Sequence, residues 1–138
     1  MKTSVQWTDG VQFVAETGSG HAFVLDGAPE YGGRNTGARP MELLLAGAAG
    51  CTAFDIVGML KKSRQPVTGV RVEAEAERAD TEPKVFTTIK LTYHVRGKGV
   101  DRTAVERAVK LSKEKYCSAT AMLGKTAEIT TEIVLSDD

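Results

Sequence analysis

The sequence predicts an α+β fold, in which antiparallel strands and helices occupy separate stretches of the chain. Three observations support this prediction. Short alternating segments fill the N-terminal third, a long apolar helical segment follows, and a β-hairpin, a second helix and one more strand complete the chain. At 138 residues the chain is the size of one domain, so we expect a single domain over residues 1–138.

The N-terminal segments TSVQW, VQFVA and HAFVL predict a three-stranded antiparallel meander. Asp9-Gly10 and Gly18-Ser19-Gly20, which separate them, are typical of the turns between hairpin strands. Residues 26–39 then carry several glycines and show no apolar period. We expect them to form a long surface loop.

A long helix is predicted from Met41 to about Lys62, with Pro40 at the first helical position. Its side chains are apolar on nearly every face, which predicts a central, buried helix. Gly47, Gly50 and Gly58 each lower helix propensity by about 1 kcal/mol relative to alanine. We therefore expect another helix, from a second subunit, to pack closely against them.

The rest of the chain alternates between strand and helix patterns. Apolar and charged residues alternate over residues 70–77, and a turn at residues 80–83 leads to a second apolar strand, which predicts a β-hairpin. Asp101 is suited to cap the helix that follows. The predicted elements are strands at 70–77, 86–95 and 127–135, a helix from Asp101 toward Cys117, and a short helix at 118–123.

The charge balance and the composition limit the classes of partner that the protein could bind. Basic and acidic residues both number 18, and this zero net charge argues against nucleic acid or an anionic membrane surface as a partner. The N-terminus shows no signal-peptide pattern, and Glu42 and Asp55 interrupt the longest apolar segment, which argues against a membrane span. We expect a cytoplasmic protein that acts on a small molecule.

No cofactor or metal site is expected from the sequence. His21 and His94 stand alone, without a second ligand at metal-binding spacing. The glycine-rich segment GGRNTG does not follow a predicted strand and lacks the Gly-Lys-Ser ending of a phosphate loop.

Two cysteines are the leading candidates for chemistry. Cys51 lies inside the apolar helical segment and Cys117 ends an amphipathic stretch, far beyond Cys-x-x-Cys spacing, so only the fold could bring them together. In a reducing compartment such a pair is transient, catalytic or merely buried. Taken alone, Cys51 is more typical of an inert core thiol. Cys117 precedes a helical turn whose free N–H groups favour a thiolate.

Four charged residues near the long helix are further candidates. Asp55 lies four residues after Cys51, on the same helix face, where its charge would oppose a thiolate. Glu42 is either a functional acid or a first-turn residue that complements the helix dipole. Arg34 and Arg39 flank the helix entrance, and either one would supply a cation to a site or remain a solvated loop residue.

The segment ARPMELLLAGAAGCTAFDIV, followed by a hairpin, a helix and EKYCSATAML, resembles the OsmC and Ohr superfamily of osmotically inducible and organic hydroperoxide resistance proteins, and within it the YhfA-like subgroup. The resemblance covers essentially the whole chain. It implies an OsmC-like intertwined homodimer of α+β fold, with the cysteine-bearing helices packed centrally and two active sites at the interface. It also implies that the first cysteine reduces organic hydroperoxides, the second forms a disulfide with it, and an Arg and Glu pair activates the first thiolate.

By motif position these roles fall to Cys51 and Cys117, with Glu42 and a loop arginine as the activating pair. The chain departs from the Ohr pattern at Met41, where Ohr proteins place their catalytic Glu; Glu42 is one position later, as in broader OsmC-like sequences. Residues 1–33 contain no arginine, although the family's activating arginine comes from these strands. Arg39, next to the helix entrance, is therefore preferred over Arg34. The second cysteine is followed by serine, where the family commonly has proline.

Three hypotheses follow. The first is a dithiol peroxidase in which Cys51 reduces an organic hydroperoxide, Cys117 resolves it, and a dithiol reductant of the lipoyl or thioredoxin type restores both thiols. The second is a binding or redox-sensing module that holds an apolar ligand and has little or no peroxidase turnover. The third, a non-redox enzyme with a nucleophilic thiol, is the weakest, because neither histidine has a recognisable link to a cysteine.

Overall fold

The structure is a computed structural model that describes residues 1–137. The chain forms two compact units, Met1–Leu44 and the part from Leu45 onward, which are described separately. The helix α1 (Pro40–Lys62) begins in the first unit and continues into the second. The assignment of residues 1–138 to one domain stays a prediction.

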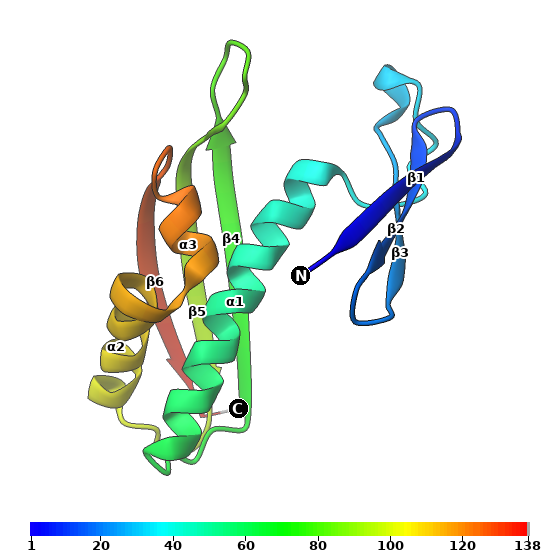
Figure 1. The fold of residues 1–138 in the computed structure, drawn as a ribbon. Coiled ribbons are helices and arrows are strands. Elements are labelled where there is room, and N and C mark those ends of the chain that lie inside the picture. The colour runs from blue at the N-terminus through cyan, green and yellow to red at the C-terminus, as the bar shows by residue number, and fades with distance from the viewer. Residues whose placement is uncertain (138) are drawn as a thin grey trace. The chain divides into compact units, whose positions relative to one another are not determined.

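The first unit contains an antiparallel meander, as predicted. Its strands β1 (Thr3–Asp9), β2 (Gln12–Thr17) and β3 (Ala22–Leu25) lie in chain order in one sheet (Figure 1). Gly10, in the first turn, has a φ of 56°, a left-handed conformation that glycine adopts without steric cost. The alternating segments and turn residues were sufficient to predict this unit.

The residues of the loop 26–39 are exposed or half-buried, except for one buried residue that holds the loop in place. Asp26 is 2% exposed, and its carboxylate accepts hydrogen bonds from the backbone N–H groups of Gly27, Arg34 and Thr36 and from the Thr36 hydroxyl. The Thr36 hydroxyl bond and these N–H bonds lower the pKa of Asp26 from 3.8 to about 2, against the opposing effect of burial. The loop also holds a short 3₁₀ turn at Pro29–Tyr31.

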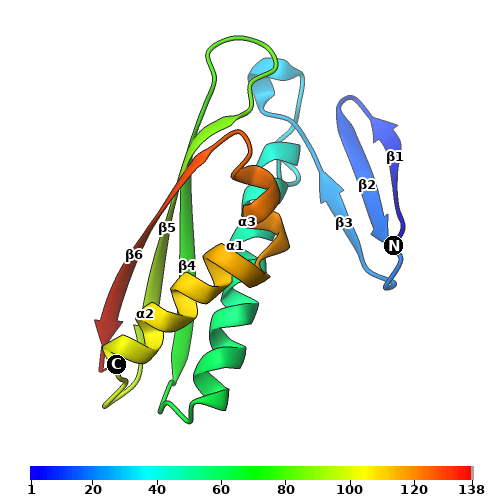
Figure 2. The ribbon, with the colours of Figure 1, turned by 60° about the vertical axis from the view of Figure 1, so that its left-hand side comes forward.

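The second unit is a three-stranded sheet with helices on one face (Figures 1 and 2). The strand order is β4-β5-β6; β4 pairs antiparallel with β5, as the predicted hairpin requires, and β6 pairs parallel with β5. Its elements after α1 are β4 (Gly69–Arg78), β5 (Phe86–Arg96), α2 (Arg102–Leu111), the π-helical turn η2 (Ser112–Tyr116), α3 (Ser118–Leu123) and β6 (Glu128–Ser136). The predicted elements are thus all present.

The core of the second unit lies between the sheet and the helices. Every second residue of the central strand points into it, and α1 contributes one stripe at four-residue spacing. Asp101 caps α2 as expected, because its carboxylate accepts a hydrogen bond from the Thr103 N–H at 3.0 Å. The buried residues include Phe86, Ile89, Leu91, Tyr93 and Val95 from β5, Ala48, Thr52, Ile56 and Leu60 from α1, and Val105, Ala108 and Val109 from α2.

The expectation that α1 is buried on nearly every face is wrong for the single chain. Only its one stripe is buried, and Phe54 remains 83% exposed. A Cβ added at Gly47, Gly50 or Gly58 would meet no heavy atom within 4 Å, the helix's own nearby backbone aside. One sheet can cover only one side of a helix, so the close partner predicted for these glycines is not supplied by residues 1–137.

Candidate active site

The fold brings the two cysteines together. Cys51 lies near the middle of α1 and is half-buried, whereas Cys117 lies between η2 and α3 and is 2% exposed. Both are free thiols. Burial is the main cause that raises the pKa of Cys117, and the interaction with Cys51 raises it further, so the two side chains lie near each other. Two thiols far apart in the sequence are therefore neighbours within the second unit.

Cys117 is the N-cap of α3, but the cap does not make it acidic. Its sulfur accepts a hydrogen bond from the Thr120 N–H at 3.4 Å. Burial, the largest effect, raises the pKa of Cys117, and the opposing contacts with the Thr120 hydroxyl and N–H do not outweigh it. The sequence-based expectation that the helical turn favours a Cys117 thiolate is therefore wrong, because the thiol is shielded from water.

A buried cluster of hydroxyl groups lies beside the thiols. The Thr52 hydroxyl is 2.8 Å from the Tyr93 hydroxyl and 2.7 Å from the Ser112 hydroxyl, which donates to the Asp55 carboxylate at 2.9 Å. Burial raises the pKa of Tyr93, and the charges of Cys117 and Asp55 raise it further, while the bond to Thr52 lowers it. Tyr93 is therefore an uncharged phenol at neutral pH, within electrostatic range of Cys117.

Sequence reasoning named only Asp55 of this cluster. Thr52 adjoins Cys51 in the chain, and Ser112 occupies a position of the buried stripe that continues from α2. A hydroxyl residue at an otherwise apolar position was the available signal, because a buried polar group requires a hydrogen-bond partner. The sequence does not reveal which partner each hydroxyl has.

Arg39 and Glu42 meet at the start of α1. The Glu42 carboxylate accepts a hydrogen bond from the Arg39 backbone N–H at 2.8 Å, which is one half of a capping box. The Arg39 guanidinium donates to the Asn35 side-chain oxygen at 2.5 Å and to the Gly37 carbonyl at 3.3 Å. Glu42 thus has the helix-start role considered above, and a catalytic role for either residue stays a prediction.

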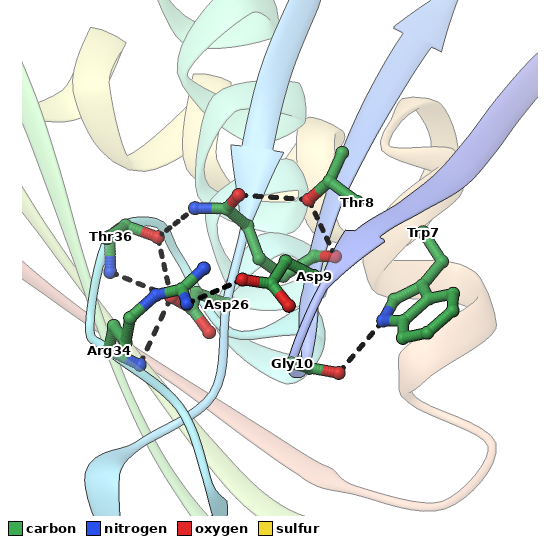
Figure 3. Close-up of polar contacts among 8 residues, drawn as sticks. Trp7, Thr8, Asp9, Gly10, Asp26, Arg34 and Thr36 are labelled. Atoms are coloured by element: carbon green, nitrogen blue, oxygen red, sulfur yellow. Dashed lines mark hydrogen bonds and ion pairs between the residues drawn. The ribbon is translucent and has the colours of Figure 1, made fainter.

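Arg34 has a different partner. Its guanidinium, in the loop of residues 26–39, forms an ion pair at 2.9 Å with Asp9, the last residue of β1 (Figure 3). This contact is the main cause that lowers the pKa of the Asp9 carboxyl. Because its charge is already paired, Arg34 is the weaker candidate for the activating cation.

Three kinds of comparison agree on the family. The family model of OsmC-like proteins matches residues 33–132. The chain is 41% identical over 133 residues to protein YhfA of Escherichia coli K12, covering 94% of each chain. This similarity confirms the resemblance to the YhfA-like subgroup.

Solved structures show the same fold. A protein of Aquifex aeolicus VF5 superposes with a TM-score of 0.86 at 30% identity, over 99% of this chain and 97% of that one. An organic hydroperoxide resistance protein OsmC of Legionella pneumophila superposes with a TM-score of 0.72 at 21% identity, over 96% of both chains. The matching family model and the similarity to YhfA show that the chain belongs to the OsmC-like family.

Proposed function

We propose that this OsmC-like protein is a dithiol peroxidase that reduces organic hydroperoxides. The observation that supports the proposal best is the proximity of Cys51 and Cys117, which come from separate helical elements and lie near enough for Cys51 to raise the pKa of Cys117. The Legionella relative carries the name of an organic hydroperoxide resistance protein, which agrees with this chemistry.

The first step oxidises Cys51. Its thiolate attacks the distal oxygen of the hydroperoxide, the O–O bond breaks, and the leaving alkoxide takes a proton to become an alcohol. Cys51 is then a sulfenic acid. Cys51 is the better suited of the two for this step, because it is half-buried and a substrate can reach it more easily than the 2% exposed Cys117.

The second step forms the disulfide. The Cys117 sulfur bonds to the Cys51 sulfur, the S–O bond of the sulfenic acid breaks, and the departing hydroxide takes the Cys117 proton and leaves as water. A raised pKa keeps Cys117 a thiol until this moment, so the proton needed for water formation is available in the site. A dithiol of the lipoyl or thioredoxin type then reduces the disulfide.

We also propose that the protein is a cytoplasmic homodimer and that Arg39 and Glu42 are the pair that activates Cys51. Glu42 already contacts the Arg39 backbone, so the two residues are held at the same helix end. The proposed substrate is small and largely apolar.

Substituting each cysteine separately tests the roles. Cys51→Ser is expected to abolish consumption of cumene hydroperoxide with dihydrolipoamide as reductant, because no atom remains to accept the peroxide oxygen. Cys117→Ser is expected to lose turnover but to keep one round of Cys51 oxidation, seen by mass spectrometry as trapped sulfenic acid. Equal residual turnover in both variants, or first oxidation at Cys117, would contradict the assignment.

A second candidate is a redox-sensing module with little turnover. It is favoured by the burial of Cys117 and its raised pKa, since a thiol attacks a sulfenic acid more slowly than a thiolate. In that case the same peroxide oxidises Cys51 stoichiometrically, but dihydrolipoamide supports no sustained consumption.

A further inference from the structure

The turn that carries Cys51 and the turn that carries Cys117 are joined by two hydrogen bonds. Thr52, the residue after Cys51, has its hydroxyl 2.7 Å from the Ser112 hydroxyl. The Ser112 carbonyl in turn accepts the backbone N–H of Cys117 at 2.8 Å. One route of bonds between the two cysteines thus runs from Cys51 to the adjoining Thr52, across the hydroxyl bond to Ser112, and from the Ser112 carbonyl to the Cys117 N–H.

The donors and acceptors of this route are fixed by its neighbours. Ser112 donates its hydroxyl proton to the Asp55 carboxylate, so toward Thr52 it can only accept. Thr52 must therefore donate to Ser112 and accept from the Tyr93 hydroxyl. Each hydroxyl therefore donates to the next group in the series: Tyr93 to Thr52, Thr52 to Ser112, and Ser112 to the Asp55 carboxylate. No alternative arrangement satisfies every group.

The route is also shielded from water. Thr52 is 1% exposed, and Ser112 and Tyr93 are 0% exposed. A buried hydroxyl that loses its partner cannot turn to water instead, so these bonds resist breaking more than surface bonds do.

Ser112 also begins the π-helical turn η2, and its bond to Cys117 spans five residues. Such wide turns are rare and frequently occur at functional sites. Here the wide turn ends at Cys117, so the position of Ser112 determines where that cysteine lies.

We propose that Thr52 and Ser112 act as positioning residues, a clasp that holds Cys51 and Cys117 at the separation needed for their disulfide. The inference rests on the proposed function only in that it assumes a Cys51–Cys117 disulfide. A disulfide requires Cα atoms about 4.4–6.8 Å apart in a narrow range of orientations, so a small displacement of either turn lowers the effective concentration of one thiol at the other. Neither residue exchanges atoms with the substrate.

The test measures the equilibrium between the dithiol and the disulfide in mixtures of reduced and oxidised glutathione, read by mass spectrometry after acid quenching. Thr52→Val keeps the shape of the side chain and removes the hydroxyl, and it is expected to lower the equilibrium constant for disulfide formation by about tenfold. Ser112→Ala is expected to lower it to a similar extent. Thr52→Ser, which keeps the hydroxyl, is expected to restore the wild-type constant.

Two controls separate positioning from general destabilisation. Tyr93→Phe removes a buried hydroxyl bond to Thr52 but leaves the Thr52–Ser112 bond, so it is expected to lower thermal stability while the equilibrium constant stays near that of the wild type. Ser118→Ala removes an exposed hydroxyl beside Cys117 and is expected to change neither quantity. The double variant of Thr52→Val and Ser112→Ala is expected to lose no more than one single variant, because both break the same bond.

The outcomes distinguish a failure of the clasp from a failure of the proposed thiol chemistry. If Thr52→Val and Ser112→Ala, shown to be folded by circular dichroism, form the disulfide as readily as the wild type, the clasp is overturned and the thiol chemistry stands. If only one of these variants folds, the disulfide equilibrium constant of that variant decides whether the clasp exists. A wild-type protein that forms no Cys51–Cys117 disulfide at any glutathione ratio overturns both.

Discussion

The two cysteines differ in their exposure to water, and this difference divides their roles. Burial raises the pKa of Cys117 above its ordinary value of 9.0. The folded state therefore binds this proton more tightly than the unfolded state does. The resulting stabilisation is complete below pH 9.0 and is lost as the pH rises through the folded-state value. Neutral pH keeps Cys117 in the form that the second step consumes.

We predict that Arg39, rather than Arg34, supports the reactivity of Cys51. Arg39→Met is expected to slow iodoacetamide alkylation of Cys51 at neutral pH by about three- to tenfold, because in the proposed activating role the Arg39 guanidinium is the cation that favours the thiolate. The measurement is the alkylation rate between pH 6 and 9, followed by mass spectrometry in a Cys117→Ser background.

Arg34→Met is the matched control. Its guanidinium is paired with Asp9, so its loss is expected to leave the alkylation profile of Cys51 unchanged. Superimposable profiles for the wild type and both arginine variants would eliminate a loop arginine as the activator and would favour the redox-sensing candidate.

At the scale of elements, the loop of residues 26–39 is organised by Asp26 rather than by an apolar core. Its carboxylate holds both ends of the segment between Gly27 and Thr36. Glycine is required where the loop folds back on itself: Gly33 packs against the backbone of Gly27, and Gly37 against that of Val24. This anchoring precedes α1 directly, so it sets how the chain enters the helix.

The low pKa of Asp26 predicts that the first unit weakens in acid. Because the folded-state pKa is depressed from 3.8 to about 2, the stabilisation is present above pH 3.8 and is lost as the pH falls through about 2. Asp26→Asn is expected to abolish this acid dependence and to destabilise the unit at neutral pH. Fluorescence of Trp7, the single tryptophan, reports on the first unit during acid titration.

Glu30→Gln serves as the control, since Glu30 is an exposed acid of the same loop. It is expected to leave the acid titration unchanged. A wild-type Trp7 signal that is flat down to pH 2, or the same transition in Asp26→Asn, would show that Asp26 does not organise the loop.

At the scale of the whole molecule, the main feature is the uncovered face of α1. This helix is long and apolar enough to span a membrane, but the core helix of a soluble protein has the same length and composition. The OsmC-like fold and the presence of Asp55 within the helix favour the soluble alternative. Large exposed apolar side chains on this face, such as Phe54, are typical of an interaction surface.

We predict that a second copy of the chain covers this face. Sedimentation at low micromolar concentration is expected to show a homodimer, and Gly50→Leu is expected to weaken it by roughly 1–3 kcal/mol through overpacking. Gly50→Ala is expected to change stability in opposite directions in a monomer and in a dimer. In a monomer it would stabilise α1 by about 1 kcal/mol, because a Cβ there meets nothing in the chain. Against a closely packed partner it destabilises the assembly instead.

Lys110→Leu, at an exposed position of α2, controls for the effect of a surface leucine and is expected to leave the oligomeric state unchanged. A stable wild-type monomer, or a Gly50→Ala variant that is simply more stable, would contradict the dimer.

The sequence alone determined the order and type of the elements, because alternation, helical period and turn residues act over a few neighbouring positions. The meander, the helix that starts at Pro40, the hairpin and the Asp101 cap were all predictable in this way. It also identified both cysteines and the OsmC-like family, since these depend on residue type and motif.

The contacts of the cysteines and their neighbours, in contrast, depend on the three-dimensional fold. The parallel pairing of β6 with β5 and the meeting of Cys51 with Cys117 join segments whose separation in the chain leaves no local signal. The acidity expected of Cys117 from its helical turn was reversed by burial, and burial is a property of the whole fold. The hydroxyl bonds among Thr52, Tyr93 and Ser112 likewise exist only because the fold brings α1, β5 and η2 together.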